Sequence, residues 1–212
     1  MNNKIIIAID AMGGENAPSK NIEGVFLYLK KNKKKKDVFF NLYGNEDLIK
    51  KELNKHNIST DFYQIFPSST VVSDEETPLT AIKNSKDSSM WNSINSQIIS
   101  NSNITLSAGN TGVLFVVSRM LLKTIESVSK PALAGLWPNE KNMNVVLDLG
   151  ANVECDDKNL VDFSEMGSAL YKALFPNDTP KVALLNIGSE EIKGTEMLKK
   201  TFTKLKDISK YG

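Results

Sequence analysis

The sequence predicts an α/β fold, a three-layer α/β/α sandwich around a mainly parallel sheet. Short apolar runs alternate with segments of helical periodicity, which is the pattern of consecutive βαβ units. Four of these runs end in loops rich in Gly, Asn and acidic residues, namely Lys4–Ile9, Ile104–Leu106, Val145–Leu147 and Val182–Leu185. Loops at the carboxyl ends of parallel strands line one crevice, where backbone N–H groups and helix N-termini favour an anion. We therefore expect a single phosphate-binding cleft.

The first half of the chain shows the alternation element by element. A strand over Ile5–Ile9 precedes a helix over Ser19–Lys31, in which apolar residues between Ile22 and Leu29 follow the spacing of one helical face. The next predicted elements are a strand over Val38–Tyr43, a helix over Asp47–Asn54 and a strand over Phe62–Phe66.

The second half continues the same pattern. Helices are predicted over Ser88–Ser100, Thr111–Lys123, Leu160–Leu174 and Glu196–Lys206. The run Leu133–Trp137 is predicted to be a strand that covers an edge of the sheet. Because no linker or internal repeat marks a boundary, we expect residues 1–212 to form one α/β domain.

Composition excludes several classes of protein. A 41% hydrophobic and 24% charged chain is typical of a soluble globular protein, and a net charge of +1 gives no support for nucleic-acid binding. The single Cys155 cannot form an intrachain disulfide, and strand-like sequence directly after Met1 argues against a secretory signal. No apolar stretch reaches the ~20 residues of a membrane-spanning helix. These observations predict a cytoplasmic protein.

Standard catalytic chemistry is poorly represented. The sequence has no Gly-x-Ser-x-Gly elbow, no Walker lysine loop and no metal-ligand spacing. The lone His56 lies at a predicted helix end and Cys155 has no evident His partner, so we expect neither to be catalytic. A cleft that binds phosphate can instead use phosphate as the nucleophile, which requires only donors that position it and stabilise charge.

Such donors are present. Lys83 and Lys86 precede Ser88 and Ser89, where the lysines could face an anion at the start of a helix; they could equally be surface residues beside an ordinary N-cap. Asn110, Thr111, Asn152 and Asn186 each follow a predicted strand, where they could bond an anion or serve as turn residues.

One charge run stands apart from these loops. The six lysines between Lys30 and Lys36 separate a predicted helix from a predicted strand. Such a block is typical of a solvated turn, and the alternative is an electrostatic contact with an acidic partner or anionic lipid.

Five segments, taken in order, closely resemble the bacterial acyl-ACP:phosphate acyltransferases of phospholipid synthesis. They are Ile7–Glu15 (IAIDAMGGE), Ser88–Met90 (SSM), Ser107–Gly112 (SAGNTG), Leu147–Val153 (LDLGANV) and Leu184–Gly194 (LLNIGSEEIKG). The resemblance implies transfer of a fatty acyl group from the thioester of acyl carrier protein to inorganic phosphate. The acyl phosphate would pass to a membrane glycerol-3-phosphate acyltransferase.

The family resemblance also carries structural implications. Its members are similar in fold to phosphotransacetylases and to the isocitrate/isopropylmalate dehydrogenase group. They work as homodimers without a metal or nucleotide cofactor and associate loosely with the inner membrane face, so we expect a homodimer with peripheral membrane contact and no cofactor.

We expect three groups of site residues. Asp10, Gly13 and Gly14 shape the first loop; Lys83, Lys86, Ser88 and Ser89 hold phosphate; Asn110, Thr111, Asn152 and Asn186 support the thioester carbonyl and the anion. The remaining residues expected to bind phosphate or substrate are Gly109, Gly150 and Lys193.

The sequence departs from the family pattern in two ways. Lys83 and Lys86 stand where family members often have arginine, which keeps the charge but loses the bidentate fork. The family's chain also continues beyond this one, so we expect the N-terminal portion of such an enzyme. Two alternatives stay open: a short-chain acyl-CoA phosphate acyltransferase, and a non-catalytic module that binds carrier protein or nucleotide.

Overall fold

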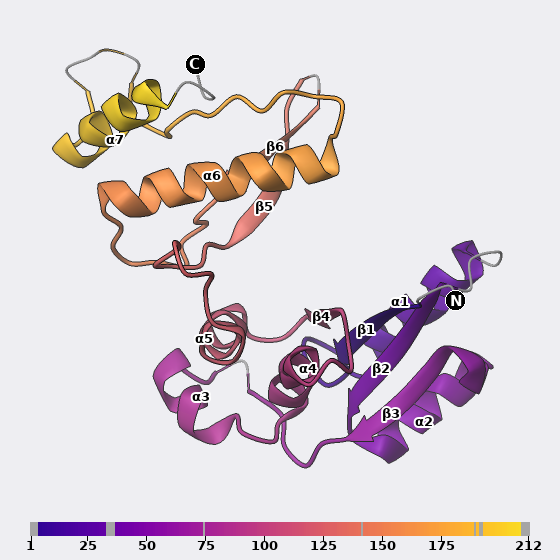
Figure 1. Ribbon diagram of the computed structural model, residues 1–212. Helices are drawn as coiled ribbons and strands as arrows, with labels where there is room; N and C mark the ends of the chain where they lie inside the picture. Colours follow the sequence, from indigo (N-terminus) through magenta and orange to yellow (C-terminus); the bar gives the residue numbers. More distant parts are fainter. Residues whose placement is uncertain are drawn as a thin grey trace. The chain divides into compact units, whose positions relative to one another are not determined.

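The computed structural model describes residues 4–32, 37–73, 75–140, 142–188, 190 and 193–208. Lysines 33–36 of the basic run lie outside the described residues. The chain divides into two compact units, residues 1–123 and 124–212, which are described separately below (Figure 1).

A four-stranded parallel sheet forms the centre of the first unit, in the order β3-β2-β1-β4. Its strands are β1 (Ile5–Asp10), β2 (Val38–Gly44), β3 (Tyr63–Pro67) and β4 (Ile104–Ser107). The chain runs outward from β1 to β2 and β3 and then crosses to β4 on the other side of β1. The sequence order therefore reverses between β1 and β4, which is where open α/β sheets bind ligands.

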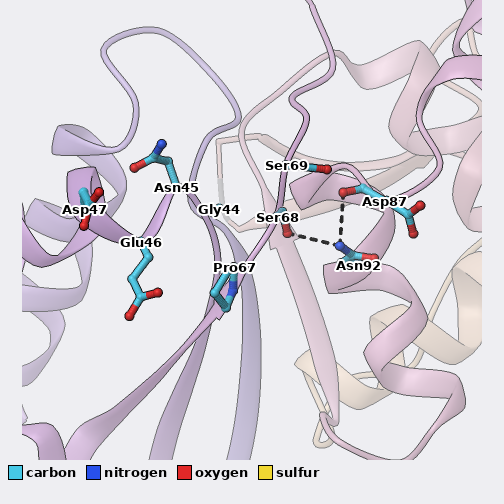
Figure 2. Close-up of a pocket in the computed structure, with 9 residues that line it drawn as sticks. All are labelled: Gly44, Asn45, Glu46, Asp47, Pro67, Ser68, Ser69, Asp87 and Asn92. Carbon is cyan, nitrogen blue, oxygen red and sulfur yellow. Dashed lines mark hydrogen bonds between the residues drawn. The ribbon is translucent and has the colours of Figure 1, made fainter.

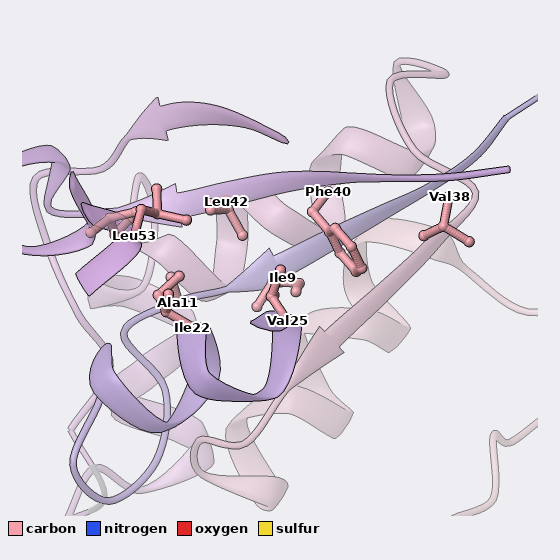
Figure 3. Close-up of a cluster of buried hydrophobic side chains, with 9 residues drawn as sticks. Ile9, Ala11, Ile22, Val25, Val38, Phe40, Leu42 and Leu53 are labelled. Carbon is pink, nitrogen blue, oxygen red and sulfur yellow. The ribbon is translucent and has the colours of Figure 1, made fainter. Parts of the chain in front are cut away.

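Helices cover both faces of this sheet. On one face, α1 (Ser19–Lys31) and α2 (Glu46–Lys55) pack against the apolar side chains of β1 and β2. Figure 3 shows eight labelled members of this core, among them Ile9, Ile22 and Phe40. A short 3-10 turn, η1 (Thr60–Phe62), leads into β3.

The opposite face is covered by α4 (Ser89–Ile98). The Thr105 hydroxyl of β4 donates to the Ser93 carbonyl of α4 at 2.9 Å. Thr105 is in register with Ala8, and side chains alternate along a strand, so α4 lies opposite the face that carries Ile9. A second core joins α4 to α5 (Thr111–Leu122), and α3 (Pro78–Asn84) contacts α5. The predicted three-layer α/β arrangement is confirmed.

The second unit is smaller. An antiparallel hairpin of β5 (Ala134–Pro138) and β6 (Met143–Leu147) packs against α6 (Asp157–Leu174), which in turn contacts α7 (Glu196–Asp207). A Cβ atom at Gly167 would lie 2.9 Å from Leu147 Cδ1, so this glycine allows α6 to approach β6 closely.

Three expectations for this unit were wrong. The strand at Val145–Leu147 is antiparallel, because the connection from Pro138 to Met143 is too short for the crossover that parallel strands need. The strand predicted at Leu133–Trp137 pairs with β6 in a separate two-stranded sheet and does not cover an edge of the parallel sheet. Residues 182–185 form no strand, because no described strand pairs with them.

Candidate functional site

Three chain segments meet at the switch between β1 and β4. A Cβ atom at Gly13, in the loop after β1, would lie 2.9 Å from the Gly109 backbone nitrogen in the loop after β4. A Cβ atom at Gly109 would lie 3.3 Å from Gly13 Cα and 3.1 Å from Met90 Cε at the start of α4. The two loops therefore touch through glycine backbones, and this contact leaves no room for side chains.

Asp10, the last residue of β1, forms hydrogen bonds with both of these loops. It is 1% exposed, and its Oδ2 accepts a hydrogen bond from the Ser107 hydroxyl at 2.7 Å. The Ser107 oxygen accepts from the Gly109 N–H at 3.2 Å, and Asp10 Oδ1 accepts from the Met12 N–H at 3.3 Å. A buried carboxylate is tolerated when it is hydrogen-bonded in this way. Asp10 thus orients the backbone of both loops.

Gly14 and Asn21 complete the first loop. Gly14 has φ +88°, and a Cβ there would lie 2.7 Å from the Ala108 carbonyl oxygen, so the position requires glycine. The Asn21 amide of α1 donates to the Ala11 and Gly13 carbonyls at 2.9 and 3.0 Å. Sequence reasoning missed Asn21 because its helical position gives no signal of these loop contacts.

The start of α4 contains the predicted pair of serines. The Ser88 hydroxyl accepts from the Trp91 N–H at 3.1 Å and caps the helix, as the alternative interpretation expected. Ser89 is 1% exposed, and its hydroxyl has no hydrogen-bond partner within the described part of the chain. Lys83 and Lys86 are exposed. Of the two serine hydroxyls, that of Ser89 is therefore the unpaired one within the described residues, and it is enclosed by protein.

Asn110 and Thr111 begin α5. Asn110 Oδ1 caps the helix by accepting from the Val113 N–H at 3.1 Å, and its amide donates to the Glu76 carbonyl at 3.0 Å. Thr111 is exposed at the first position of the helix. The Asn110 side chain thus serves the loop structure, while the first turn of α5 supplies backbone donors.

In the second unit, Gly150 and Asn152 share one loop. The Asn152 amide donates to Asp148 Oδ1 and to the Pro131 carbonyl, both at 2.9 Å. Asp148 and Gly150 both have positive φ, at +60° and +81°. Cys155 donates to Asp148 Oδ2 at 3.3 Å, and burial together with that carboxylate raises the pKa of the thiol. Cys155 is therefore a protonated thiol at neutral pH and a weak nucleophile.

Asn186 and Lys193 lie in another loop of the second unit. Asn186 Oδ1 accepts from the Ile187 N–H at 2.8 Å, and its amide donates to the Lys193 carbonyl at 3.4 Å. A Cβ at Gly194 would lie 2.7 Å from Asn186 Oδ1, so glycine lets this turn close.

A pocket of about 540 Å³ opens beside the carboxyl ends of β2 and β3 (Figure 2). Its lining residues are Gly44, Asn45, Glu46, Asp47, Pro67, Ser68, Ser69, Asp87 and Asn92. None of the predicted site residues is among them. Three carboxylates and no cation line this pocket, which makes it unsuitable for an anion. His56 also lies away from the predicted loops, since it ends α2 and stacks on Phe26 with ring centroids 4.8 Å apart.

The pattern of one protein family, described as "Fatty acid synthesis protein", matches residues 5–212. This chain belongs to that family. It is 49% identical over 205 residues to a phosphate acyltransferase of Pelagibacter ubique (strain HTCC1062), covering 97% of this chain and 60% of the relative. A phosphate acyltransferase of Ehrlichia ruminantium (strain Gardel) is 39% identical over 204 residues, with 96% and 60% covered. The chain thus spans about 60% of the length of these family members.

Solved structures show the same fold. The EutD phosphotransacetylase from Staphylococcus aureus matches with a TM-score of 0.60 at 16% identity, covering 98% of this chain and 66% of that one. A phosphotransacetylase from Streptococcus pyogenes also gives a TM-score of 0.60, at 12% identity, with 88% and 60% covered. The expected phosphotransacetylase-like fold is confirmed. Across the described residues, no helix combines the length and the apolar character that crossing a membrane requires.

Proposed function

We propose that this chain supplies the phosphate-binding part of an enzyme that transfers a fatty acyl group from acyl carrier protein to inorganic phosphate. The observation that carries the proposal is the contact between Gly13 and Gly109 at the sheet's switch point, held by the buried Asp10. This contact brings the two loops together beside the first turn of α5, whose backbone N–H groups suit a tetrahedral oxyanion. Membership of a family whose relatives are phosphate acyltransferases supports phosphate as that anion.

In the proposed reaction, a phosphate oxygen attacks the thioester carbonyl carbon. A P–O–C bond forms, the C–S bond breaks, and the carrier thiolate leaves and takes up a proton from solvent. Lys86 would hold phosphate, and Asp10 would keep the backbone of both loops in place. No protein nucleophile is required, in agreement with the protonated Cys155.

In the proposed reaction, the first unit would bind phosphate at the loops that follow β1 and β4. Because the chain spans about 60% of its relatives' length, we also propose that full activity depends on the part of the relatives that it does not match. The proposed donor is acyl carrier protein, and the proposed assembly is a homodimer with peripheral membrane contact.

Release of free carrier-protein thiol tests the function. The purified chain, and a version extended by the remaining part of a matched relative, would be given acyl carrier protein thioester with and without phosphate. We expect phosphate-dependent thiol release from the extended version and little from the chain alone. Equal turnover of acyl-CoA would favour the short-chain alternative, and release that is independent of phosphate would refute the proposal.

A further inference from the structure

The loop after β1 uses its first three backbone N–H groups within the protein. The N–H groups of Ala11, Met12 and Gly13 each donate to a protein acceptor, at 2.9, 3.3 and 3.4 Å, and the last two of these acceptors belong to Asp10. The next N–H group, that of Gly14, has no hydrogen-bond partner within the described part of the chain. Gly14 is half-buried rather than enclosed. Because backbone donors are rarely left unpaired in a folded protein, the Gly14 N–H is the first donor of the loop that is left for a ligand.

Asn21 holds the other side of the same peptide unit. It is the third residue of α1, and its side-chain amide donates to the Ala11 and Gly13 carbonyls at 2.9 and 3.0 Å. In a trans peptide unit, the C=O and the N–H that follows it point in opposite directions. The bond to the Gly13 carbonyl therefore turns the Gly14 N–H away from α1. The same geometry applies one step earlier, where Asn21 holds the Ala11 carbonyl and the Met12 N–H donates to a carboxylate on the other side.

Side-chain charge does not attract an anion to this loop. Between Asp10 and Pro18 the chain has the carboxylates of Asp10 and Glu15 and neither lysine nor arginine. Asp10 is buried and hydrogen-bonded, whereas Glu15 is exposed. Since both carboxylates repel an anion, binding at this loop depends on how well its backbone donor is oriented.

We infer that Asn21 is a positioning residue for the phosphate of the proposed reaction. By holding the Gly13 carbonyl, it directs the Gly14 N–H to the anion that the first turn of α5 also binds. Gly14 lies against the loop that leads into α5, since a Cβ atom there would lie 2.7 Å from the Ala108 carbonyl oxygen. The inference rests on the proposed function, which puts phosphate at these two loops. Asn21 acts through the backbone and does not itself contact phosphate.

Phosphate titration of the whole chain, followed by amide NMR, tests the inference. Inorganic phosphate should move the Gly14 amide proton downfield, as expected of an N–H group that begins to donate to an anion. Asn21→Leu removes the amide and keeps a side chain of similar size. This variant should show a smaller Gly14 shift and about tenfold weaker phosphate affinity, because hydrogen bonds to charged groups are among the stronger ones. In the extended enzyme, the phosphate KM should rise by a similar factor while kcat at saturating phosphate changes little, a split that a purely structural role would not produce.

Asn32→Leu is the matched control. The Asn32 amide also donates to a backbone carbonyl of α1, that of Tyr28 at 2.9 Å, but at the opposite end of the helix. This variant should lose stability in urea unfolding and keep the phosphate affinity of the parent. Asn21→Ala is the second test variant, because alanine favours the helix and reports the loss of the amide even if Asn21→Leu does not fold.

Two results would overturn the inference: a Gly14 amide that does not respond to phosphate, or Asn21 variants that bind phosphate as the parent does. The outcomes also separate the inference from the proposed function. Phosphate-dependent thiol release by the extended enzyme, with an unchanged phosphate KM in Asn21→Leu, removes the inference alone. A Gly14 response that depends on Asn21, without any phosphate-dependent thiol release, removes the function and leaves an anion site that Asn21 orients.

Discussion

Replacing Gly13 by alanine tests whether the contact between the two loops requires glycine. The added Cβ would lie 2.5 Å from Asp10 Oδ2, 2.9 Å from the Gly109 nitrogen and 3.0 Å from Ser107 Oγ. All three atoms belong to the hydrogen-bond network that joins the loops, so the clash can be relieved only if the loops separate. Overpacking of this kind costs about 1–3 kcal/mol.

Gly24 provides the matched control, because it is exposed in the middle of α1 and an added Cβ would meet no heavy atom within 4 Å. Gly24→Ala should stabilise the chain by about 1 kcal/mol through helix propensity alone. Urea unfolding followed by circular dichroism should therefore move the midpoint in opposite directions for the two variants. Phosphate titration should show weaker binding only for Gly13→Ala. A Gly13→Ala midpoint at or above that of the parent would refute the close loop contact.

Three further outcomes are expected. Lys86→Ala should weaken phosphate binding by about tenfold or more, since a charge-assisted hydrogen bond contributes about 1.5–3 kcal/mol; unchanged affinity in a phosphate titration would make Lys86 only a helix-flanking charge. Cys155→Ser should leave phosphate-dependent thiol release in the extended enzyme intact, and an acyl group trapped on Cys155 in a mass spectrum would contradict the mechanism. Hydrogen bonds and charge from Lys204 and Lys200 lower the pKa of Asp157 to about 2, so the stability that this carboxylate adds is complete above pH ~4 and lost as the pH falls towards ~2. The free energy of unfolding of Asp157→Asn should therefore fall less than that of the parent between pH ~4 and pH ~2. Identical pH profiles of stability for the variant and the parent would refute the ion pairs.

Local patterns predicted most of the elements of the first unit. The helix at Ser19–Lys31 was predicted with both of its ends, and the four parallel strands were predicted within two residues of their observed bounds. Helical periodicity and short apolar runs are properties of consecutive residues, so they can be read from the sequence. The seven-residue α3 was missed, since it is too short to show an apolar stripe.

Strand pairing in the second unit could not be predicted in the same way. Val145–Leu147 has the composition of a parallel strand, yet its partner and direction depend on β5 and on the short connection between them. The start of α6 was placed three residues late, because the helix begins at a capping box between Asp156 and Asn159 that precedes its apolar residues.

The predicted site residues also differ in how much the sequence could say about them. Gly13 and Gly14 are expected from the sequence to shape the first loop, and the structure shows a close approach at both positions. Asn110 and Asn152 were chosen for their amides, but an asparagine that bonds a ligand and one that closes a turn have the same sequence signature. Which of the two applies is decided by neighbours as distant as Glu76 and Pro131.

This distinction bears on how the anion is held. Because the Ser88 and Asn110 oxygens cap their own helices, substituting either residue removes a helix cap as well as any contact with a ligand. A loss of phosphate binding in those variants would therefore report loop structure and could not identify a ligand contact. Ser89 is different, since its buried hydroxyl bonds no other described group. Because this hydroxyl is enclosed, it can reach phosphate only if the start of α4 moves. Ser89→Ala should leave the unfolding midpoint close to that of the parent, and weaker phosphate binding by this variant would reveal such a movement, whereas a fall in stability with unchanged phosphate affinity would show that the hydroxyl serves the fold alone.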